Sequence, residues 1–406
     1  MPPIIDPGAG ATPAHIARAS SPLETAARPT RVALVGAHGH GASHLRRIAD
    51  LADRGIADLC AVADPRPPDA LKDAPPDVPW YSSLEELLAT EATTPDVVVL
   101  STPLPTHLSL TEAALRAGCD VLLEKPPTVS LAEHDRLVAI VEETGRKCQV
   151  GFQTFGSHAF AEIDRVVASG EIGEVTGIGA VGTWVRTAGY WGRAPWAGRR
   201  RMDGAEVVDG VVTNPLAHAV ATALRVGGVT RACDVDSVEA DLYRANAIEA
   251  DDTSSVRVVS ADGRSFGFGL TLCAPERSPA RVLVQGTRGD LTLFYETDRI
   301  LVRTPAGERS TTSDRTDLLT DLLMVRRDPA ATLRCDLRDT GAFMRVLEAV
   351  RVAPEPALIA SSFVTWYGED AERRPVVQDV EVWCERAART QSTFSALEAP
   401  WAAIRR

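Results

Sequence analysis

The sequence lacks the features that would place it at a membrane, on a nucleic acid or in the secretory pathway. Its 406 residues contain no apolar run near the ~20 residues that span a bilayer, and the first thirty show no basic start followed by an apolar centre. The formal net charge is -12, and the longest basic run is Arg199-Arg200-Arg201. We therefore expect a cytoplasmic protein with neither a membrane nor a nucleic acid among its partners.

Cysteine and histidine are restricted in what they can do. The seven cysteines are odd in number, widely spaced and without a Cys-x-x-Cys pair, which is typical of reduced, buried thiols and not of disulfides or a zinc site. All eight histidines lie at or before His218. Any imidazole base or ligand must therefore come from the first 218 residues.

The length and the 45% hydrophobic content predict two domains after a flexible leader. Residues 1–30 are rich in Pro, Ala, Gly and Ser and form the leader. In residues 31–150, apolar runs alternate with helical patterns, one of which opens with the capping box Ser130 and Glu133 and stops at Gly145. This alternation predicts a doubly wound Rossmann domain with a parallel sheet. The apolar runs are residues 31–35, 59–63, 97–100 and 121–123.

Residues 151–406 follow a different pattern, in which longer strand-like segments are joined by short turns. The Asp262-Gly263 pair between two of them indicates a hairpin. Helical patterns return near residues 314–324, 339–350 and 379–388. The fold class is therefore α/β, with a C-terminal α+β domain built on a large, mainly antiparallel open sheet. The predicted strands are residues 175–185, 235–244, 254–260, 265–273, 281–285 and 291–295.

A glycine-rich turn joins the first strand to the first helix. Gly36, Gly39 and Gly41 allow backbone N–H groups and the helix dipole to hold a pyrophosphate, although His38 stands where the usual pattern has glycine. Asp64, at the end of the second strand, is placed to bind the ribose hydroxyls or to serve only as a turn residue. Because a carboxylate repels a 2′-phosphate, NAD is favoured over NADP, while Arg66 keeps NADP open.

Three histidines, His38, His40 and His44, are spaced closely enough to suggest a metal cluster. However, the glycine turn constrains this backbone, and no cysteine or carboxylate is interleaved with them. The sequence therefore predicts no metal site.

Four segments together resemble the glucose-fructose oxidoreductase and inositol dehydrogenase (Gfo/Idh/MocA) family over about residues 31–400. This resemblance implies a nicotinamide cofactor on the first domain, a sugar or cyclitol between it and the open sheet, and a homodimer or homotetramer. The segments are Gly36-Ala-His-Gly-His-Gly-Ala-Ser-His44, Ser101-Thr-Pro-Leu-Pro-Thr-His107, Glu124-Lys125-Pro126 and Asn214-Pro-Leu-Ala-His218.

The same resemblance assigns roles to individual residues. Lys125 corresponds to the family's active-site lysine and His218 to its catalytic histidine. Hydride removal from a carbinol carbon independently requires a base for the hydroxyl proton and a cation for the developing alkoxide. Glu124 supports the cofactor pocket or the lysine. The residues implied on the nicotinamide side are Thr102, Pro103 and His107, and His40 lies with the cofactor-binding turn.

Asn214 departs from the family pattern, in which many relatives have Asp. The segment Thr213-Asn214-Pro215 predicts the start of a helix with Asn214 as the N-cap. Its amide can also orient a substrate hydroxyl or the imidazole, so Asn214 is a candidate for catalysis, for substrate binding or for a plain cap. Asp203, Glu206 or Asp209, which lie upstream, could supply the carboxylate that Asn214 lacks.

Residues 182–198 hold three of the seven tryptophans in a chain that is 5% aromatic. Aromatic rings interleaved with arginines suit a polyhydroxylated ring, and packing at a subunit interface is the alternative. Candidate substrate contacts are Arg186, Tyr190 and Trp191. We interpret Arg199-Arg200-Arg201 as a solvated loop in preference to a clamp for an anionic sugar.

The predicted function is an NAD-dependent oxidoreductase acting on a sugar, glycoside or cyclitol. One alternative is a glycosidase-like enzyme that retains its NAD and acts by transient oxidation and elimination. A second is a non-catalytic dinucleotide sensor, against which the presence of both Lys125 and His218 argues.

Overall fold

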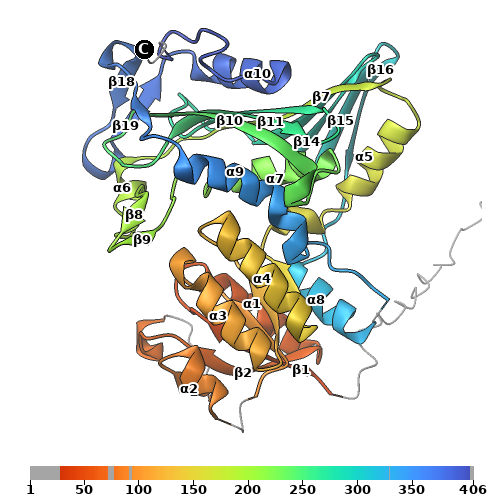
Figure 1. Cartoon of the computed structure of the whole chain (residues 1–406), viewed down its shortest axis with the longest axis vertical. Coiled ribbons are helices and arrows are strands. Elements are labelled where there is room, and N and C mark those ends of the chain that lie inside the picture. Colours follow the sequence, from red (N-terminus) through yellow and green to blue (C-terminus); the bar gives the residue numbers. More distant parts are fainter. Residues whose placement is uncertain (1–27, 72–76, 91–93, 329, 403–406) are drawn as a thin grey trace, which may run out of the picture.

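The computed structural model describes residues 28–71, 77–90, 94–328 and 330–402, so most of the predicted leader lies outside the described residues. Two sheets dominate it, one in each half of the molecule (Figure 1). Within the described residues, no helix is both long and apolar enough to cross a membrane.

The first sheet has six strands in the order β3-β2-β1-β4-β5-β6, and all neighbouring pairs are parallel. Val97–Leu100 is buried throughout, as expected for a central strand covered on both faces. The strands are β1 (Thr30–Val35), β2 (Ala57–Ala63), β3 (Trp80–Tyr81), β4 (Val97–Leu100), β5 (Asp120–Leu123) and β6 (Cys148–Val150).

Helices α1 (Gly41–Asp53), α2 (Leu84–Leu88), α3 (His107–Arg116) and α4 (Leu131–Thr144) connect these strands. The ends of α4 follow the sequence signals closely. The Ser130 side chain accepts from Glu133 N, and Gly145 closes the helix in the left-handed region at φ 64°.

The second sheet has nine strands in the order β16-β15-β14-β13-β7-β12-β11-β10-β17, antiparallel except at β7–β12 and β10–β17. Gly263, at φ 86°, lies in the turn between the antiparallel strands β11 and β12, as the hairpin signal predicted. The strands are β7 (Val175–Thr183), β10 (Val235–Arg244), β11 (Thr253–Ser260), β12 (Ser265–Thr271), β13 (Arg281–Gly286), β14 (Asp290–Phe294), β15 (Arg299–Thr304), β16 (Gly307–Thr312) and β17 (Ala357–Leu358).

Helices cover both faces of this sheet (Figure 1). Helices α7 (Ala217–Val226) and α9 (Gly341–Val352) lie between it and the first domain, and α10 (Val380–Thr390) covers the outer face. The remaining elements are α5 (Ala159–Ala168), α6 (Ala188–Trp191), α8 (Leu318–Arg327), the hairpins β8 (Arg201–Met202) with β9 (Ala205–Glu206) and β18 (Val364–Tyr367) with β19 (Arg374–Val377), and short 3₁₀ turns at Pro68–Ala70, Leu104–Thr106, Gln153–Gly156, Ala232–Asp234, Leu337–Thr340, Ser361–Phe363 and Asp370–Glu372.

Helix α10 lies directly on a glycine seat, the four glycines of β7 and β12 that face it. A Cβ on Gly179 would lie 2.4 Å from Ala388 O, and one on Gly269 would lie 2.1 Å from Cys384 O. Since no side chain fits at these positions, glycine is what lets the helix backbone rest on the strands. The seat consists of Gly177, Gly179, Gly267 and Gly269.

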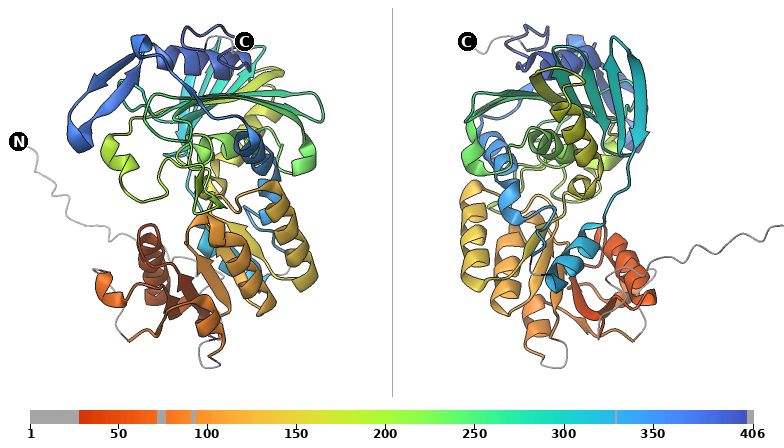
Figure 2. Two further views of the ribbon diagram at one scale, coloured as in Figure 1. Left: turned by 60° about the vertical axis from the view of Figure 1, so that its left-hand side comes forward. Right: turned by 90° about the vertical axis from the view of Figure 1, so that its right-hand side faces the viewer.

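Helix α8 returns to the first domain although it comes late in the chain (Figures 1 and 2). Gln149 Nε2 donates to Leu318 O at 3.0 Å and to Asp321 Oδ2 at 2.7 Å, and Arg326 pairs with Asp120. The predicted domain division at residue 150 is therefore crossed by a helix that packs beside β5 and β6.

The predicted fold class is confirmed, while several short elements were not foreseen. Strands β15 to β19 were not predicted, because their apolar alternation is brief. All seven cysteines are free thiols, as the sequence indicated.

Candidate active site

A cleft of about 620 Å³ lies between the two domains. Its first wall comes from the carboxyl ends of the parallel strands, where open α/β sheets bind ligands. Its second wall comes from residues 190–218. Of the predicted site residues, the lining contains His38, Gly39, His40, Thr102, Pro103, His107, Glu124, Lys125, Tyr190, Asn214 and His218.

The glycine turn lies behind and beside this lining, and two of its glycines are required by packing. A Cβ on Gly36 would lie 2.3 Å from Ser101 O, and one on Gly41 would lie 1.9 Å from Gly36 O. Gly39 has open space around it but adopts φ +62°. The turn therefore brings the N-terminus of α1 against the end of β4 with bare backbone facing the cleft.

Asp64 is buried behind the turn and is held by several donors. Its Oδ2 accepts from Ala37 N and lies 2.9 Å from His38 Nδ1, while Oδ1 accepts from Arg66 N and Arg66 Nε. Burial raises the pKa of Asp64, but these hydrogen bonds outweigh it and bring the pKa to about 2. Asp64 is thus an ionised carboxylate that fixes the turn.

These residues fit a dinucleotide. Bare glycine backbone faces the cleft at the start of α1, and the buried His38 Nε2 has no hydrogen-bond partner among the described residues. The turn, His38 and Asp64 with Arg66 would hold the cofactor's phosphates and ribose, and the bound nicotinamide would supply hydride chemistry.

Two imidazoles contact the carboxylate of Glu124, which directly follows β5. Its Oε1 lies 2.8 Å from His44 Nε2 and 3.2 Å from His40 Nε2, and its Oε2 accepts from Lys125 N at 3.2 Å. Burial raises the pKa of Glu124, but the hydrogen bonds from His40 and His44 lower it by a larger amount. The net pKa of Glu124 therefore lies well below its usual range.

His107 joins two loops of the first wall. Its Nδ1 lies 2.9 Å from Pro126 O, and its Nε2 lies 3.0 Å from Thr102 O. The Lys125–Pro126 peptide bond between these loops is cis. Burial lowers the pKa of His107, and its ring links the two loops of this wall.

Lys125 reaches across the cleft to the second wall. Its Nζ donates to Asn214 Oδ1 at 2.8 Å and to Asn214 O at 3.2 Å. Asn214 Nδ2 in turn donates to Asp209 Oδ1 at 2.5 Å, and Asp209 Oδ2 accepts from Arg193 Nη2 at 3.1 Å. Burial lowers the pKa of Lys125, while Glu124 and Asp209 oppose that shift.

The prediction that Asn214 caps a helix is wrong. Helix α7 begins three residues later, at Ala217, with Leu216 at the N-cap and no side-chain cap. The Asn214 amide contacts Lys125 and Asp209 and makes no cap to α7. Of the three upstream carboxylates, Asp209 is the one that reaches Asn214.

Asp209 is aimed by a strained turn that the sequence did not reveal. Val208 adopts φ 51°, a conformation that β-branched residues rarely occupy. Its carbonyl accepts from Gly210 N at 3.0 Å and from the Thr213 hydroxyl, and its N–H donates to Arg200 O at 3.1 Å. These bonds hold Val208 in place and turn the next carboxylate toward Asn214.

His218 is the second residue of α7 and faces the cleft. Burial, together with the charge of Lys125, lowers the pKa of His218 to about 3. Its ring meets Phe152 edge-on at 5.6 Å between centroids, and its Nδ1 has no hydrogen-bond partner among the described residues. His218 is therefore neutral at physiological pH, and it lines the cleft.

The aromatic segment contributes different residues from those predicted. Tyr190 lines the cleft, but Arg186 and Trp191 do not, and Arg193 and Trp196 take their place. The Arg193 guanidinium lies 3.7 Å from the Tyr190 ring centroid and 4.6 Å from that of Trp196. The position of Arg193 between the Tyr190 and Trp196 rings depends on how the loop folds. Sequence periodicity therefore could not identify these residues.

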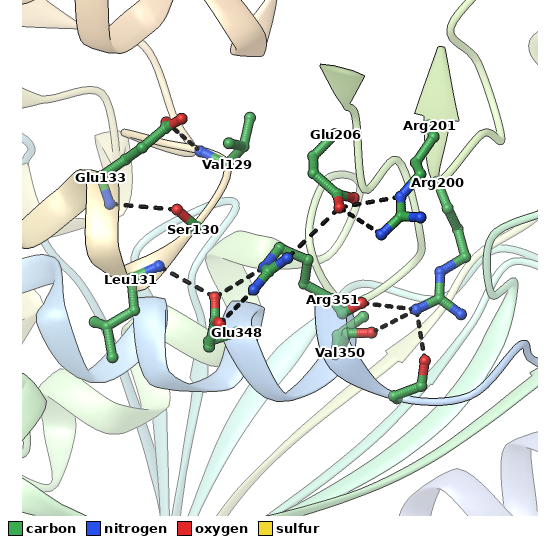
Figure 3. Close-up of polar contacts among 11 residues, drawn as sticks. Val129, Ser130, Leu131, Glu133, Arg200, Arg201, Glu206, Glu348, Val350 and Arg351 are labelled. Carbon is green, nitrogen blue, oxygen red and sulfur yellow. Dashed lines mark hydrogen bonds and ion pairs between the residues drawn. The ribbon is translucent and has the colours of Figure 1, made fainter. Parts of the chain in front are cut away.

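A polar relay links the first domain to the second wall (Figure 3). Leu131 N, at the start of α4, donates to Glu348 of α9, which pairs with Arg351. Arg351 lies 3.5 Å from Glu206 in β9, and Glu206 pairs with Arg201 in β8. The relay fixes the hairpin from which residues 207–214 enter the cleft.

Two of the three consecutive arginines, Arg200 and Arg201, bind other parts of the second domain (Figure 3). Arg200 donates to the terminal carbonyls of α9, including Arg351 O at 2.9 Å and Ala353 O at 2.7 Å, where a cation also complements the helix dipole. Arg199 lies 3.7 Å from Glu249. These side chains do not line the cleft.

The fold and the cleft define a class, that of NAD-binding two-domain oxidoreductases. Residues 30–152 match the model of the oxidoreductase family with an NAD-binding Rossmann fold, and residues 160–292 match the GFO/IDH/MocA C-terminal domain. The chain belongs to the Gfo/Idh/MocA family. The predicted family and the predicted NAD-binding first domain are thereby confirmed.

Curated relatives match over part of their length. Inositol 2-dehydrogenase 4 of Saccharopolyspora erythraea is 37% identical over 149 residues, 36% of this chain and 43% of that protein. The scyllo-inositol 2-dehydrogenase (NAD(+)) of Bacillus subtilis is 39% identical over 79 residues, 20% of this chain and 23% of that protein. The chain therefore spans less than half the length of these relatives.

A solved structure shares the fold over a greater length. The WlbA dehydrogenase from Bordetella pertussis, in complex with NADH and UDP-GlcNAcA, has a TM-score of 0.65 at 22% identity and covers 80% of this chain and 95% of its own. This likeness shows the common architecture.

Proposed function

We propose that this protein transfers a hydride between NAD and a carbinol or carbonyl carbon of a sugar, glycoside or cyclitol. In this proposal His218 is the acid/base, Lys125 polarises the reacting oxygen, and Asn214 positions the lysine. The observation that carries it is the convergence of Lys125 and His218, which are distant in sequence, in one cleft beside the glycine turn.

The chemistry of the two groups is complementary. In the oxidative direction, the neutral His218 takes the hydroxyl proton while the Lys125 ammonium stabilises the charge that develops on the oxygen. The same ammonium disfavours a charged imidazole. After oxidation, His218 therefore readily gives the proton up to solvent. In reduction, His218 returns the proton to the carbonyl oxygen.

The second wall supports a polyhydroxylated substrate. Tyr190 and Trp196 place aromatic rings in the cleft lining on either side of Arg193, whose guanidinium offers donors to hydroxyl oxygens. The relatives include inositol dehydrogenases and a dehydrogenase bound to a sugar nucleotide, and their names are consistent with a polyhydroxylated substrate.

The test is a screen of sugars, inositols and glycosides with NAD and with NADP, in which reduced nicotinamide is followed by absorbance. NADH formation with one of these classes supports the proposal. Release of free sugar from a glycoside without net NADH formation would instead establish the elimination mechanism. Dinucleotide binding with no turnover of any class would favour the sensor.

We also keep the homodimer or homotetramer as a proposal, with a restricted geometry. Helix α10 packs on the central strands β7 and β12 of the large sheet, so a second copy would have to pair through another surface, such as the β14–β16 end. Light scattering of the purified chain during size-exclusion chromatography measures the mass, and a monomer would contradict this proposal.

A further inference from the structure

We propose that His40, His44 and Glu124 form a binding site for a divalent transition-metal ion, with zinc as the best match. The three ligand atoms, two imidazole nitrogens and one carboxylate oxygen, all lie within 4.8 Å of one another. The sequence argument against a metal rested on the absence of an interleaved carboxylate. The fold supplies that carboxylate from the neighbouring strand end, 80 residues away.

The ligand set matches zinc in chemistry and in arrangement. His40 and His44 are four residues apart at the start of α1, so their side chains fall on one face of the helix. Two histidines and one carboxylate are a recurrent zinc-binding combination that leaves a coordination position open.

The two spacings to Glu124 require little movement to admit an ion. With metal–ligand bonds of about 2.1 Å, the ligand atoms of a tetrahedral site lie roughly 3.4 Å apart. The His40 nitrogen already lies 3.2 Å from Glu124 Oε1, and the His44 nitrogen at 2.8 Å must withdraw by about half an ångström. An ion would replace the two hydrogen bonds with two metal bonds to the same imidazoles.

The surroundings support the charge and orientation of the ligands. The Glu124 carboxyl group lies beside the N-terminus of α1, whose positive dipole end would otherwise oppose a cation. Lys125 N donates to the second carboxylate oxygen and so directs Oε1 toward the histidines. A Cβ on Gly151 would lie 2.9 Å from that same oxygen, so the carboxylate is held on its other side as well.

The site opens toward the cleft on one side only. The His44 and Glu124 side chains are 7% and 11% exposed, whereas His40 is 61% exposed and lines the cleft. The fourth position would therefore be taken by water or by a ligand entering the cleft.

The experiment uses the full chain without a histidine tag, freed of metal by a chelator and titrated with Co²⁺ and Zn²⁺. We expect one ion per chain by calorimetry, and the intense visible absorption of four- or five-coordinate cobalt. His40→Ala changes an exposed side chain and His44→Ala a buried one. Each should weaken binding by at least about 100-fold, the upper end of losses measured when even supporting residues are removed.

The matched control is His158→Ala, since His158 is exposed, bonds Thr316 and lies outside the cleft lining. It should bind cobalt like the wild type. The proposal is overturned if no stoichiometric ion binds, if cobalt gives only the weak six-coordinate spectrum, or if His40→Ala binds as tightly as the control. NADH binding by fluorescence, measured separately, reports on the proposed oxidoreductase function independently of these outcomes.

Discussion

The two walls of the cleft are built in different ways. In the first wall, the turn at Gly36 to Gly41, Asp64 and Glu124 lie at the ends of the parallel strands β1, β2 and β5, and backbone groups contribute much of their positioning. In the second wall, a chain of side chains from Lys125 through Asn214 and Asp209 to Arg193 determines the geometry. The first wall is thus set largely by main-chain groups, and the second wall by side-chain contacts between distant segments.

This difference predicts which substitutions affect which property. Changes in the first wall should act on folding and on dinucleotide binding together, because the turn cannot move without the sheet. Changes in the second wall should act on turnover while dinucleotide affinity is preserved.

Lys125→Met should have the largest effect. Removing the ammonium that polarises the substrate oxygen should lower kcat by about 10³-fold, within the range for loss of an oxyanion-stabilising donor. The dissociation constant for NADH should change little, and fluorescence titration measures it beside the steady-state rates. Unchanged turnover would refute the catalytic role of Lys125.

Gly41→Ala and Gly39→Ala separate packing from backbone conformation within one turn. The added methyl at 41 meets a carbonyl at 1.9 Å, so we expect a loss of about 3 kcal/mol in the free energy of unfolding. At 39 nothing lies nearby and only φ +62° is unfavourable, which should cost about 1 kcal/mol. Equal losses in urea unfolding would contradict this account of the turn.

Asp209→Asn tests the second wall. It removes the charge shared by Asn214 and Arg193 while preserving shape, and should lower kcat/KM by roughly 30-fold, about 2 kcal/mol, without changing NADH affinity. Asp203→Asn is the control, because Asp203 is also upstream of Asn214 but is exposed and lies outside the cleft lining. If the two variants behave alike, Asp209 has no special role.

The last test concerns pH and His218. Its pKa is about 3 in the fold against 6.5 in the unfolded chain, so between these values the unfolded chain binds more protons. Stability should therefore fall as pH drops through this window, by at most about 1.4 kcal/mol per pH unit from this group. His218→Gln should show a shallower decline in urea unfolding across the window, and His158→Gln, as the control, should retain the wild-type slope.

The sequence identified more of the residues in the first wall than of those in the second. The glycine turn, Asp64 and the Glu124-Lys125 pair follow local patterns tied to strand ends, and the structure brings them to one edge of the sheet. Arg193 and Trp196 were not selected, and Asp209 was one of three choices, because their positions depend on the irregular loop through Val208. The helix-cap prediction for Asn214 failed because local propensity was overridden by contacts from Lys125 and Asp209.

The glycine seat beneath α10 has a consequence for evolution. A side chain at position 179, 267 or 269 would meet the backbone of α10 and lift the helix, whereas one at 177 would meet only the Gln391 side chain, so the first three positions are the most constrained while the C-terminal cover is kept. Two Gly-x-Gly pairs on strands that lie side by side in the sheet therefore form a signature readable from a bare genome sequence. It would sort relatives that carry such a cover from those that leave their sheet open.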